Sequence, residues 1–563
     1  MKEPQPRFNY FLRLIFLSLP SLSCLLFPSF LVAQEKPYDF VIKDALVFDG
    51  ESLIPKKQDI AISGNYFSVL GEVAREEAKE VIEAGGLVAA PGFIDAHTHS
   101  DFNPFVYPHL GNKVLQGVTT EVVGNCGMSA APVLGLHTDE ITKVWSREGV
   151  EIPPALPWKS FGDYVNEVEA QGPDTNFASL VGHGNLRSSV IGMKPRPLEP
   201  DEMESVTKLL RESMDEGAAG ISFGFPYLPG IFATHEEIVA LCHEAAAKRG
   251  LCAFHIRSEG RQLIEAIREA IEVGRTAQAP VHISHLKAAG MKNWPKIDEA
   301  FRLIEEAQAQ GLRVTADAYP YTASFAELGV ILPDKLYQDP NRLARFKDLR
   351  QRKALLRELN KHYKTSPASW DRIRIATLIT DKNTSLRGKT LLEVAEAQKK
   401  SPVQVLVELL ADEEFRVSAF YFSQSEAVLS QVFSKPYVAV GSDSIADGSA
   451  MPHPRSYGTF PRLLAKCAQE GSVMTSPCWG TAIQQMTALP AKIFGLKQRG
   501  KITAGYYADL VLFNPETVKD QADYEHPKTT PQGIEWVFVN GAPVVQKGKY
   551  LPGHSGLFLT REK

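Results

Sequence analysis

The sequence lacks both an excess of positive charge and a dense set of cysteines. Its formal net charge is -5 and its pI is about 6.3, whereas a protein that binds nucleic acid usually presents a basic face, so the composition gives no support for such a partner. Six cysteines among 563 residues are too few for the disulfide framework of a small domain without a core. Hydrophobic residues make up 44% and charged residues 23% of the chain, as in ordinary folded proteins, and the length predicts more than one domain.

Long apolar runs are absent except near the N-terminus, where residues 14–32 follow a basic segment and precede the small residue Ala33. This order predicts a secretory signal peptide over residues 1–33, and therefore an exported, periplasmic protein. An uncleaved membrane anchor is the alternative, but Pro20 and Pro28 make a poor spanning helix. No other stretch is apolar enough to span a bilayer, so we expect no membrane span in the mature protein.

Cysteine positions bear on lipidation and on disulfides. Cys24 invites a lipoprotein interpretation, which is less favoured because Ser21 stands where a lipidation site normally has an aliphatic residue. Removal of the signal peptide leaves an odd number of cysteines. An oxidising compartment would allow disulfides among the last four, but the sequence does not decide whether they form. These four are Cys242, Cys252, Cys467 and Cys478.

The two ends of the chain share a β-rich pattern. Residues 36–90 contain short strand-like runs separated by turns such as Gly64-Asn65, with only a weak helical period at residues 72–79. Similar strands and turns return within residues 491–555. We therefore expect the two ends to form one small β-sandwich domain.

Strands alternate with helices over residues 91–490, which predicts a (β/α)₈ barrel. A doubly wound open sheet is the alternative. The eight predicted strands are Gly92–Ala96, Thr119–Val123, Ala178–Val181, Gly220–Phe223, Cys252–His255, Val281–Ile283, Arg313–Ala316 and Val438–Val440.

Helical periodicity of 3 and 4 residues marks the stretches between many of these strands. A longer gap, about residues 333–401, holds charged helical sequence such as residues 342–362, and we expect it to be an insertion over the mouth of the barrel. The predicted barrel helices are Glu202–Glu216, Glu236–Lys248, Glu259–Val273 and Lys296–Gln310.

Strong metal-ligand residue types follow five of the predicted strands. Because side chains alternate along a strand, His97 and His99 point the same way, and two imidazoles on one face form half of a metal site. Barrel enzymes place their catalytic groups at the carboxyl ends of the strands, so the sequence predicts a metal centre there. The further candidates are Cys126 after the second strand, His255 after the fifth, His285 after the sixth and Asp443 after the eighth.

Each of these residues also has a purely structural interpretation. Cys126 as a buried thiol is disfavoured by its flanking glycines, which expose it at a strand end. Core histidines at positions 255 and 285, and a helix N-cap at Asp443, are the corresponding alternatives. His282 remains a further candidate, as a ligand or as the support of one.

At this point the motifs resemble those of a known family. Pro91–Asp101 resembles the first metal motif of the amidohydrolase superfamily, whose members combine a (β/α)₈ barrel with a small β-sandwich made from both ends of the chain. Gly117–Gly127 is similar to the N-acyl-D-amino-acid deacylase (D-aminoacylase) branch, in which a cysteine after the second strand is a metal ligand. Other branches often use a carboxylated lysine after the fourth strand, and Gly220–Pro226 has no lysine there. The resemblance covers about residues 38–549, with further motifs at Gly182–Arg187, Tyr227–Gly230, His255–Glu259, Ser284–Lys287, Asp317–Tyr321, Gly441–Asp443 and Pro452–Phe460.

The resemblance implies one tight Zn²⁺ site and a second, weaker or empty, site. Cys126, His255 and His285 would hold the tight zinc. His97 and His99 would frame the second position. The chemistry agrees, because thiolate and imidazole nitrogen are ligands that zinc favours.

The resemblance also implies roles for residues around the metal. Asp443 would act as the general base and acid. The α-carboxylate of the substrate would be held by charge-assisted hydrogen bonds from Lys287 and Arg455, together with Tyr227 and Tyr319. Ordinary surface charge is the alternative for the two cations.

The predicted reaction is zinc-dependent hydrolysis of a small-molecule N-acyl-D-amino acid to a carboxylate and a free D-amino acid. The D configuration comes from the resemblance alone. Phe225-Pro226, near the expected pocket wall, predicts an acyl or side-chain preference different from that of close relatives. A dipeptidase, a cyclic-amide hydrolase of the hydantoinase or dihydroorotase type, and a non-catalytic exported binding protein are the alternatives. The oligomeric state is not evident from the sequence.

Overall fold

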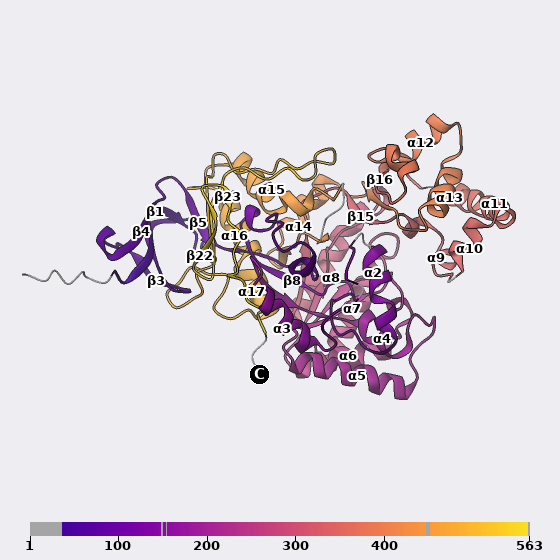
Figure 1. Ribbon diagram of the computed structural model, residues 1–563, viewed down its shortest axis with the longest axis horizontal. Coiled ribbons are helices and arrows are strands. Elements are labelled where there is room, and N and C mark those ends of the chain that lie inside the picture. The colour runs from indigo at the N-terminus through magenta and orange to yellow at the C-terminus, as the bar shows by residue number, and fades with distance from the viewer. Residues whose placement is uncertain are drawn as a thin grey trace, which may run out of the picture. The chain divides into compact units, whose positions relative to one another are not determined.

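A computed structural model describes residues 36–147, 150–153, 155–339, 341–366, 368–445 and 451–560 (Figure 1). The predicted signal peptide, residues 1–33, with its Cys24, lies outside these residues. Residues from Pro37 onward form one compact unit. Within the described ranges, no helix is both long and apolar enough to cross a membrane.

Parallel strands close into a barrel. The third strand is divided into β9 and β10, and the remaining strands pair in sequence order from β6 to β18. The circle closes where the amide of Ala96 donates to the carbonyl of Val440, at 3.1 Å. The predicted (β/α)₈ barrel is therefore confirmed, and an open sheet is excluded. The strands are β6 (Phe93–Asp95), β8 (Val118–Val123), β9 (Asn176–Ser179), β10 (Val181–Gly182), β11 (Gly220–Gly224), β12 (Leu251–His255), β13 (Val281–Ile283), β14 (Val314–Ala318) and β18 (Val438–Val440).

Amphipathic helices cover the outside of the barrel. α5 begins at a capping box between Glu199 and Glu202, and buries Val206 and Leu210, four residues apart, against the barrel. Short helix α1 lies between the first and second barrel strands, and short helix α2 lies between the second and third. The helices are α1 (Asn103–Val106), α2 (Ile141–Arg147), α3 (Phe161–Gln171), α4 (His183–Ile191), α5 (Pro200–Asp215), α6 (His235–Ala247), α7 (Leu263–Ala277), α8 (Ile297–Ala309), α14 (Glu426–Phe433), α15 (Arg455–Glu470), α16 (Pro477–Met486) and α17 (Ala488–Phe494).

Both ends of the chain contribute to one nine-stranded sheet. β5 joins the two contributions, because it pairs in parallel with β1 and antiparallel with β20. Buried side chains from both ends, including Ile42 and Phe538, share one hydrophobic cluster. The predicted β-domain built from both ends is thus confirmed. Its strands are β1 (Tyr38–Val47), β2 (Lys56–Ser63), β3 (Tyr66–Gly71), β4 (Ala78–Glu83), β5 (Val88–Pro91), β20 (Leu510–Phe513), β21 (Ile534–Val539), β22 (Ala542–Gln546) and β23 (Lys549–Tyr550).

An inserted module separates β14 from α14, and Figure 1 shows its helices α9 to α13 gathered together. It has its own hydrophobic cluster and a three-stranded antiparallel sheet. The predicted bounds, about 333–401, are too narrow. The short strands at both edges of the module pair with each other although they lie far apart in the sequence, and neither shows a periodic pattern that would reveal it. The elements are β15 (Ser324–Glu327), α9 (Asp334–Tyr337), α10 (Arg342–Lys347), α11 (Leu349–Thr365), β16 (Ile373–Thr377), α12 (Leu391–Gln398), α13 (Pro402–Asp412) and β17 (Ser418–Tyr421).

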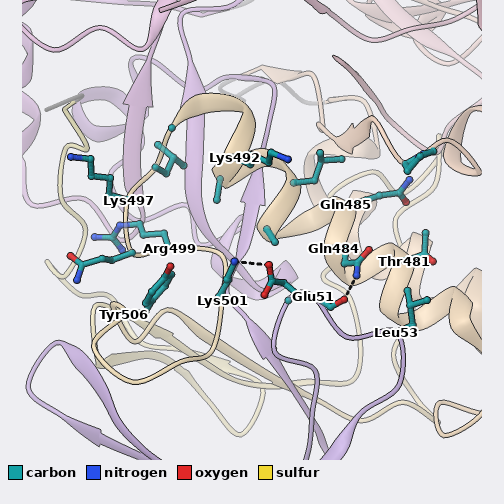
Figure 2. Close-up of a pocket in the computed structure, with 18 of the residues that line it drawn as sticks. Glu51, Leu53, Thr481, Gln484, Gln485, Lys492, Lys497, Arg499, Lys501 and Tyr506 are labelled. Atoms are coloured by element: carbon teal, nitrogen blue, oxygen red, sulfur yellow. Dashed lines mark hydrogen bonds and ion pairs between the residues drawn. The ribbon is translucent and has the colours of Figure 1, made fainter. Parts of the chain in front are cut away.

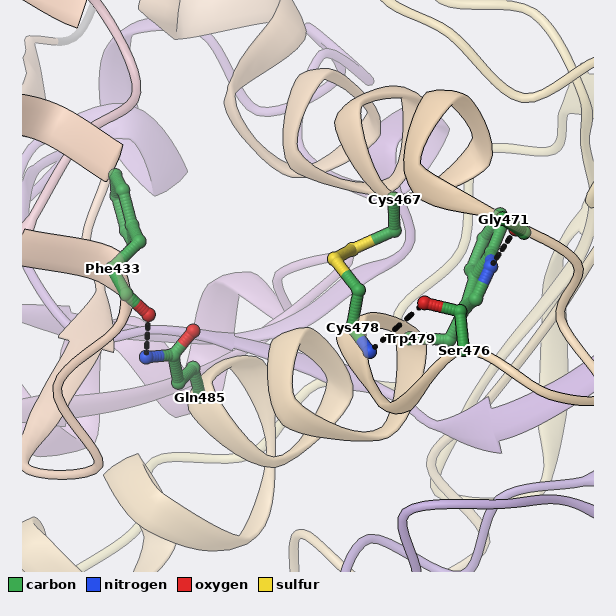
Figure 3. Close-up of a disulfide and its surroundings, with 7 residues drawn as sticks. All are labelled: Phe433, Cys467, Gly471, Ser476, Cys478, Trp479 and Gln485. Atoms are coloured by element: carbon green, nitrogen blue, oxygen red, sulfur yellow. Dashed lines mark hydrogen bonds between the residues drawn. A yellow bond between two sulfur atoms is a disulfide. The ribbon is translucent and has the colours of Figure 1, made fainter. Parts of the chain in front are cut away.

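Two disulfides answer the question that the sequence left open. Cys242 of α6 is bonded to Cys252 of β12, and Cys467 of α15 is bonded to Cys478 of α16. Figure 3 shows the second bridge between its two helices. Cys126 is free and buried.

Candidate active site

Two groups of potential metal ligands meet at the carboxyl ends of the barrel strands. One comprises His97, His99 and Cys126, and the other comprises Cys126, His255 and His285; within each group the ligand atoms lie within 4.8 Å of one another. The Cys126 thiol is common to both. Its Sγ lies 3.4 Å from His97 Nε2 and 3.5 Å from His285 Nε2. The structure therefore brings together all five residues that the sequence nominated as ligands.

Unusual backbone conformations direct three of the key side chains into the site. Cys126, His285 and Asp443 have φ values of 53°, 37° and 49°, a region that residues other than glycine rarely adopt. Gly124 allows the close approach that Cys126 needs, since a Cβ at this glycine would lie 2.0 Å from the carbonyl oxygen of Leu180. Such conformations cost free energy and are found where a site requires them.

Burial and charge favour the thiolate form of Cys126. Burial raises the pKa of the thiol, but the positive charges of His97, His285 and His255 outweigh burial and hold the pKa well below its ordinary value. A thiolate among imidazoles is a donor set that suits zinc. His99 Nδ1 is buried and has no hydrogen-bond partner among the described residues, as expected of an atom left for a ligand. The residues present therefore fit a metal ion.

Asp317, at the end of β14, supports the ligands. One carboxylate oxygen, Oδ2, lies 3.1 Å from His97 Nδ1 and 2.9 Å from His282 Nε2, while Oδ1 accepts the amide of His285 at 2.9 Å. Burial alone would raise the pKa of Asp317, but His97 and His282 lower it far below its usual value. The sequence prediction gave this aspartate no role. Its only signal was the Asp317–Tyr321 motif at a strand end.

His282 proves to belong with Asp317 rather than with the ligand groups. Its Nε2 faces the Asp317 carboxylate and its Nδ1 lies 2.9 Å from the hydroxyl of Thr315. Both ring nitrogens are thus engaged within the barrel wall. Of the two roles that the sequence left open, the geometry favours support of a ligand.

Asp443 lies between the ligand histidines and a buried arginine. Its Oδ1 lies 3.4 Å from His99 Nε2 and 3.6 Å from His97 Nε2, and its Oδ2 accepts from Arg455 Nη1 at 2.8 Å. Burial raises the pKa of Asp443, but Arg455 and the histidines outweigh burial and lower it well below its ordinary value. The carboxylate is therefore ionised, with one oxygen directed at the metal ligands.

Lys287 is held by a carboxylate that the sequence prediction gave no role. Its ammonium forms an ion pair with Glu259 and lies 3.0 Å from His285 Nδ1, while Glu259 Oε1 lies 2.7 Å from the same ring nitrogen. Burial lowers the pKa of Lys287, but Glu259 outweighs burial and raises it above its ordinary value. The lysine thus bears its charge beside the ligand His285, within 5.6 Å of the Tyr319 ring.

The remaining predicted residues, Tyr227, Tyr319 and Arg455, lie around the same centre. The ring of Tyr227 lies 5.1 Å from that of His255. The guanidinium of Arg455 lies 4.7 Å from the ring centroid of Tyr319. Tyr319 Oη and Arg455 Nε are buried and have no hydrogen-bond partner in the part of the chain that the structure describes. Two buried donors without partners, on neighbouring side chains, are suitable for binding an anion.

Comparison with known proteins now gives the family. The model of the amidohydrolase family matches residues 80–329 and 348–545. This chain belongs to the amidohydrolase family. D-aminoacylase of Alcaligenes xylosoxydans xylosoxydans is 33% identical, and the match covers 94% of this chain and 99% of that protein. The family resemblance found in the motifs is therefore confirmed, and it places the chain among the D-aminoacylases and N-acyl-D-amino-acid deacylases.

Solved structures of amidohydrolase family members support the same placement. A structure of D-aminoacylase that addresses the functional role of its binuclear metal centre matches with a TM-score of 0.77 and 32% identity, over 93% of this chain and 100% of that one. A structure of N-acyl-D-glutamate deacylase from Bordetella bronchiseptica, complexed with zinc and a phosphonate inhibitor, matches with a TM-score of 0.77 and 30% identity over the same shares.

Proposed function

We propose that this protein hydrolyses the amide bond of N-acyl-D-amino acids and releases a carboxylate and a free D-amino acid. The observation that carries the proposal is the match, over nearly the whole chain, to D-aminoacylase, joined to a buried thiolate–imidazole cluster at the barrel mouth. Relatives named N-acyl-D-glutamate and N-acyl-D-aspartate deacylase, 32% and 33% identical, support the same reaction on a linear amide. The enzyme is a metal-dependent amidohydrolase.

The donor atoms support two neighbouring zinc positions, whose ligand groups have Cys126 in common. Cys126, His255 and His285 would hold a tight zinc, and His97 and His99 would frame a second, weaker position. When bound, zinc supplies a Lewis acid that polarises the amide carbonyl and makes a nearby water more acidic. Asp317 and Glu259 would orient the histidines from behind, as carboxylates commonly do for metal-bound imidazoles.

The proton transfers of the reaction are assigned to Asp443. Its Oδ1 faces the ligand histidines, so it is the carboxylate oxygen placed to accept a proton from the attacking water. Oxygen from water then adds to the acyl carbon, the C–N bond breaks, and the same carboxyl group returns the proton to the departing nitrogen. Arg455 holds the other oxygen, Oδ2, and thereby fixes the direction of Oδ1.

Recognition of the substrate α-carboxylate is assigned to the cationic and phenolic groups beside Asp443. Arg455 and Tyr319 each present a buried donor without a partner among the described residues. Lys287 adds positive charge, and Tyr227 closes the side next to His255. An amino acid whose nitrogen carries an acyl group retains the single negative charge that this receptor requires.

A substrate panel tests the proposed reaction. Zinc-loaded protein is incubated with N-acetyl-D-amino acids, their L-enantiomers, dipeptides and hydantoins, and release of free amine is measured. We expect turnover of the N-acetyl-D-amino acids, which chelation of the metal abolishes and added zinc restores. Preferred turnover of hydantoins or dipeptides would support the cyclic-amide or dipeptidase alternative instead. Metal-replete protein that hydrolyses none of them would support a binding protein.

Substitution of Asp443 tests the assigned proton transfer. Asp443→Asn retains the shape of the side chain and its hydrogen bond to Arg455 but cannot accept the proton, so we expect kcat to fall by about 10²–10⁴-fold with zinc content unchanged. Asp298→Asn, on the exposed face of α8, is the matched control and should keep full activity. Near-normal turnover by the Asp443 variant would remove Asp443 from the mechanism.

We also propose that the protein is exported to the periplasm after cleavage near Ala33, without lipidation. The two disulfides support this location, because such bonds persist in oxidising compartments. Cell fractionation with mass measurement of the isolated protein tests the proposal. We expect periplasmic protein that lacks about the first 33 residues, as such a signal is removed on export. An intact N-terminus in the cytoplasmic fraction would contradict it.

A further inference from the structure

A large cavity lies at the end of the barrel opposite to the metal-donor cluster (Figure 2). Arg249 and Pro436 in its wall precede strands β12 and β18, whereas His255 and Asp443 stand at the carboxyl ends of the same strands. A strand of five residues spans roughly 16 Å, so the cavity is separate from the candidate active site. Its volume is about 1250 Å³, somewhat more than most small-molecule sites enclose.

Segments from both parts of the molecule form this cavity. α16, α17 and the segment that follows to residue 501 supply most of the wall, and the loop that follows β1 supplies Gly50, Glu51 and Leu53. Figure 2 shows Lys497 and Arg499 on the side away from Leu53, with Lys492 between the two sides. The β-domain and the barrel thus each contribute to the wall of one cavity.

Positive charge predominates in the cavity. Five cationic side chains line it, with a single carboxylate, that of Glu51. This carboxylate is already paired, because Lys501 Nζ lies 2.6 Å from its Oε1, and Arg499 is paired with a buried aspartate outside the wall. Arg249 and Lys492 are exposed, and neither has a carboxylate oxygen of the described residues within 4.0 Å. The cavity therefore retains positive charge that an anion would balance.

An apolar surface lies beside this charge. The side chain of Leu53 is 46% exposed. Leu489 and Leu496 line the same cavity, and both are half-buried against the hydrophobic cluster at this end of the barrel. Water against these leucines is unfavourable, and a hydrocarbon chain would displace it. A plain inorganic anion would leave this surface uncovered.

We propose that the cavity binds an amphipathic carboxylate, that is, an acid group joined to a hydrocarbon chain. Arg249 and Lys492 neutralise the acid group. The chain lies on Leu53, Leu489 and Leu496. This binding site uses no residue of the candidate active site, and the proposal does not depend on the reaction that the protein catalyses.

Calorimetric titration with decanoate tests the proposal on purified, zinc-loaded protein. We expect saturable binding that Arg249→Glu combined with Lys492→Glu weakens at least tenfold, because the exposed cations become anions without disturbing the core. The matched control reverses the charge of Arg350 and Lys361, two exposed cations on α11 of the inserted module, and should bind decanoate as the native protein does. Near-ultraviolet circular dichroism and zinc content establish that each variant is folded.

The length of the hydrocarbon chain of the ligand tests the apolar part of the proposed site separately from the cationic part. Native protein should bind decanoate more tightly than hexanoate, and Leu53→Ser should reduce this preference. If the double charge reversal leaves decanoate affinity unchanged, the proposed site is wrong. This outcome is expected if decanoate binds only at the active site. Equal affinities for decanoate, hexanoate and inorganic phosphate would overturn the apolar half. Binding to vesicles of anionic phospholipid without binding of free decanoate would overturn a soluble ligand.

Discussion

At the scale of single residues, the site depends on buried charges that stabilise one another. Three neighbouring imidazoles lower the pKa of Cys126 and so favour its thiolate form, and His97 is in turn oriented by Asp317. A buried ion without such partners would cost several kcal/mol. Residue types and strand ends were enough to select the five potential ligands that the structure brings together. They did not predict Asp317 and Glu259, because the positions of these carboxylates behind the ligands depend on distances between strands that lie far apart in the sequence.

Asp317→Asn tests this support. The amide keeps the shape of the side chain and can still accept the amide of His285 through Oδ1, but it removes the negative charge that faces His97 and His282. Loss of such a carboxylate typically lowers metal affinity by about 10–100-fold, and we expect a decrease in that range. Competition with a zinc chelator measures it, and Asp298→Asn is the control. Native zinc affinity in the Asp317 variant would show that the carboxylate does not position the ligands.

His137 predicts how stability depends on pH. Burial lowers the pKa of His137 in the folded protein to about 4, whereas a histidine in an unfolded chain titrates near 6.5. Between these values the unfolded chain binds a proton that the folded protein does not, so the free energy of unfolding falls as the pH falls through this window. Urea titrations at pH 7 and pH 4.5 should show a loss about 2–3 kcal/mol larger in the native protein than in His137→Gln. Equal losses in both proteins would contradict the assignment.

At the scale of elements, local periodicity predicts the bounds of a helix well where the helix packs on one face. It predicts them poorly where contacts with distant residues determine the local structure. The predicted bounds of α5, α6 and α8 are nearly those observed. α7 begins at Leu263 rather than at Glu259, because the Glu259 carboxylate is held by Lys287 and His285 before the helix starts. The weak helical period at residues 72–79 forms only a short 3-10 turn and then β4, because parallel pairing with β1 satisfies that backbone.

The disulfide between α15 and α16 predicts a stability effect at this scale. Cys467 and Cys478 close a loop of about 12 residues, and a cross-link of this length contributes about 3 kcal/mol through the entropy of the unfolded chain. We expect Cys467→Ser with Cys478→Ser to lower the free energy of unfolding by that order. Zinc content should stay unchanged, because Cys467 lies near the carboxyl end of α15, whereas Arg455 lies at its amino end. The measurement is urea unfolding followed by tryptophan fluorescence. An unchanged midpoint would indicate that the bond does not form in the protein as isolated.

At the scale of the whole molecule, separate hydrophobic clusters hold separate parts. The inserted module has a cluster of its own, distinct from that of the barrel. Alternation of strands and helices was enough to predict the barrel. The similar pattern of short strands and turns at the two ends of the chain was enough to predict that they form one domain. The bounds of the module were not predictable, because its sheet consists of short strands within residues 324–421 whose partners lie far away in the sequence.

Leu406→Ala tests the independence of the module. Leu406 is fully buried in α13, and removal of such a side chain costs about 2–5 kcal/mol. Because the cluster does not include barrel residues, we expect lower stability of the module, seen as greater susceptibility to proteolysis within residues 324–421, with zinc content unchanged. Leu349→Ala, at a side chain that is 72% exposed on α11, is the control and should change neither. Loss of zinc from the Leu406 variant would show that the two cores are coupled.

The pairing of β5 with β20 also determines when the molecule can be completed. Val88 of β5 pairs with Phe513 of β20. Strands β1 to β5 are therefore synthesised long before β20, and β5 lacks this neighbour until almost the whole chain has been made. At synthesis rates of about 5–20 residues per second, this interval is on the order of tens of seconds. During that time the edge of β5 is open to pairing with other chains. The amino-terminal strands are therefore open to mispairing until the carboxyl-terminal strands arrive.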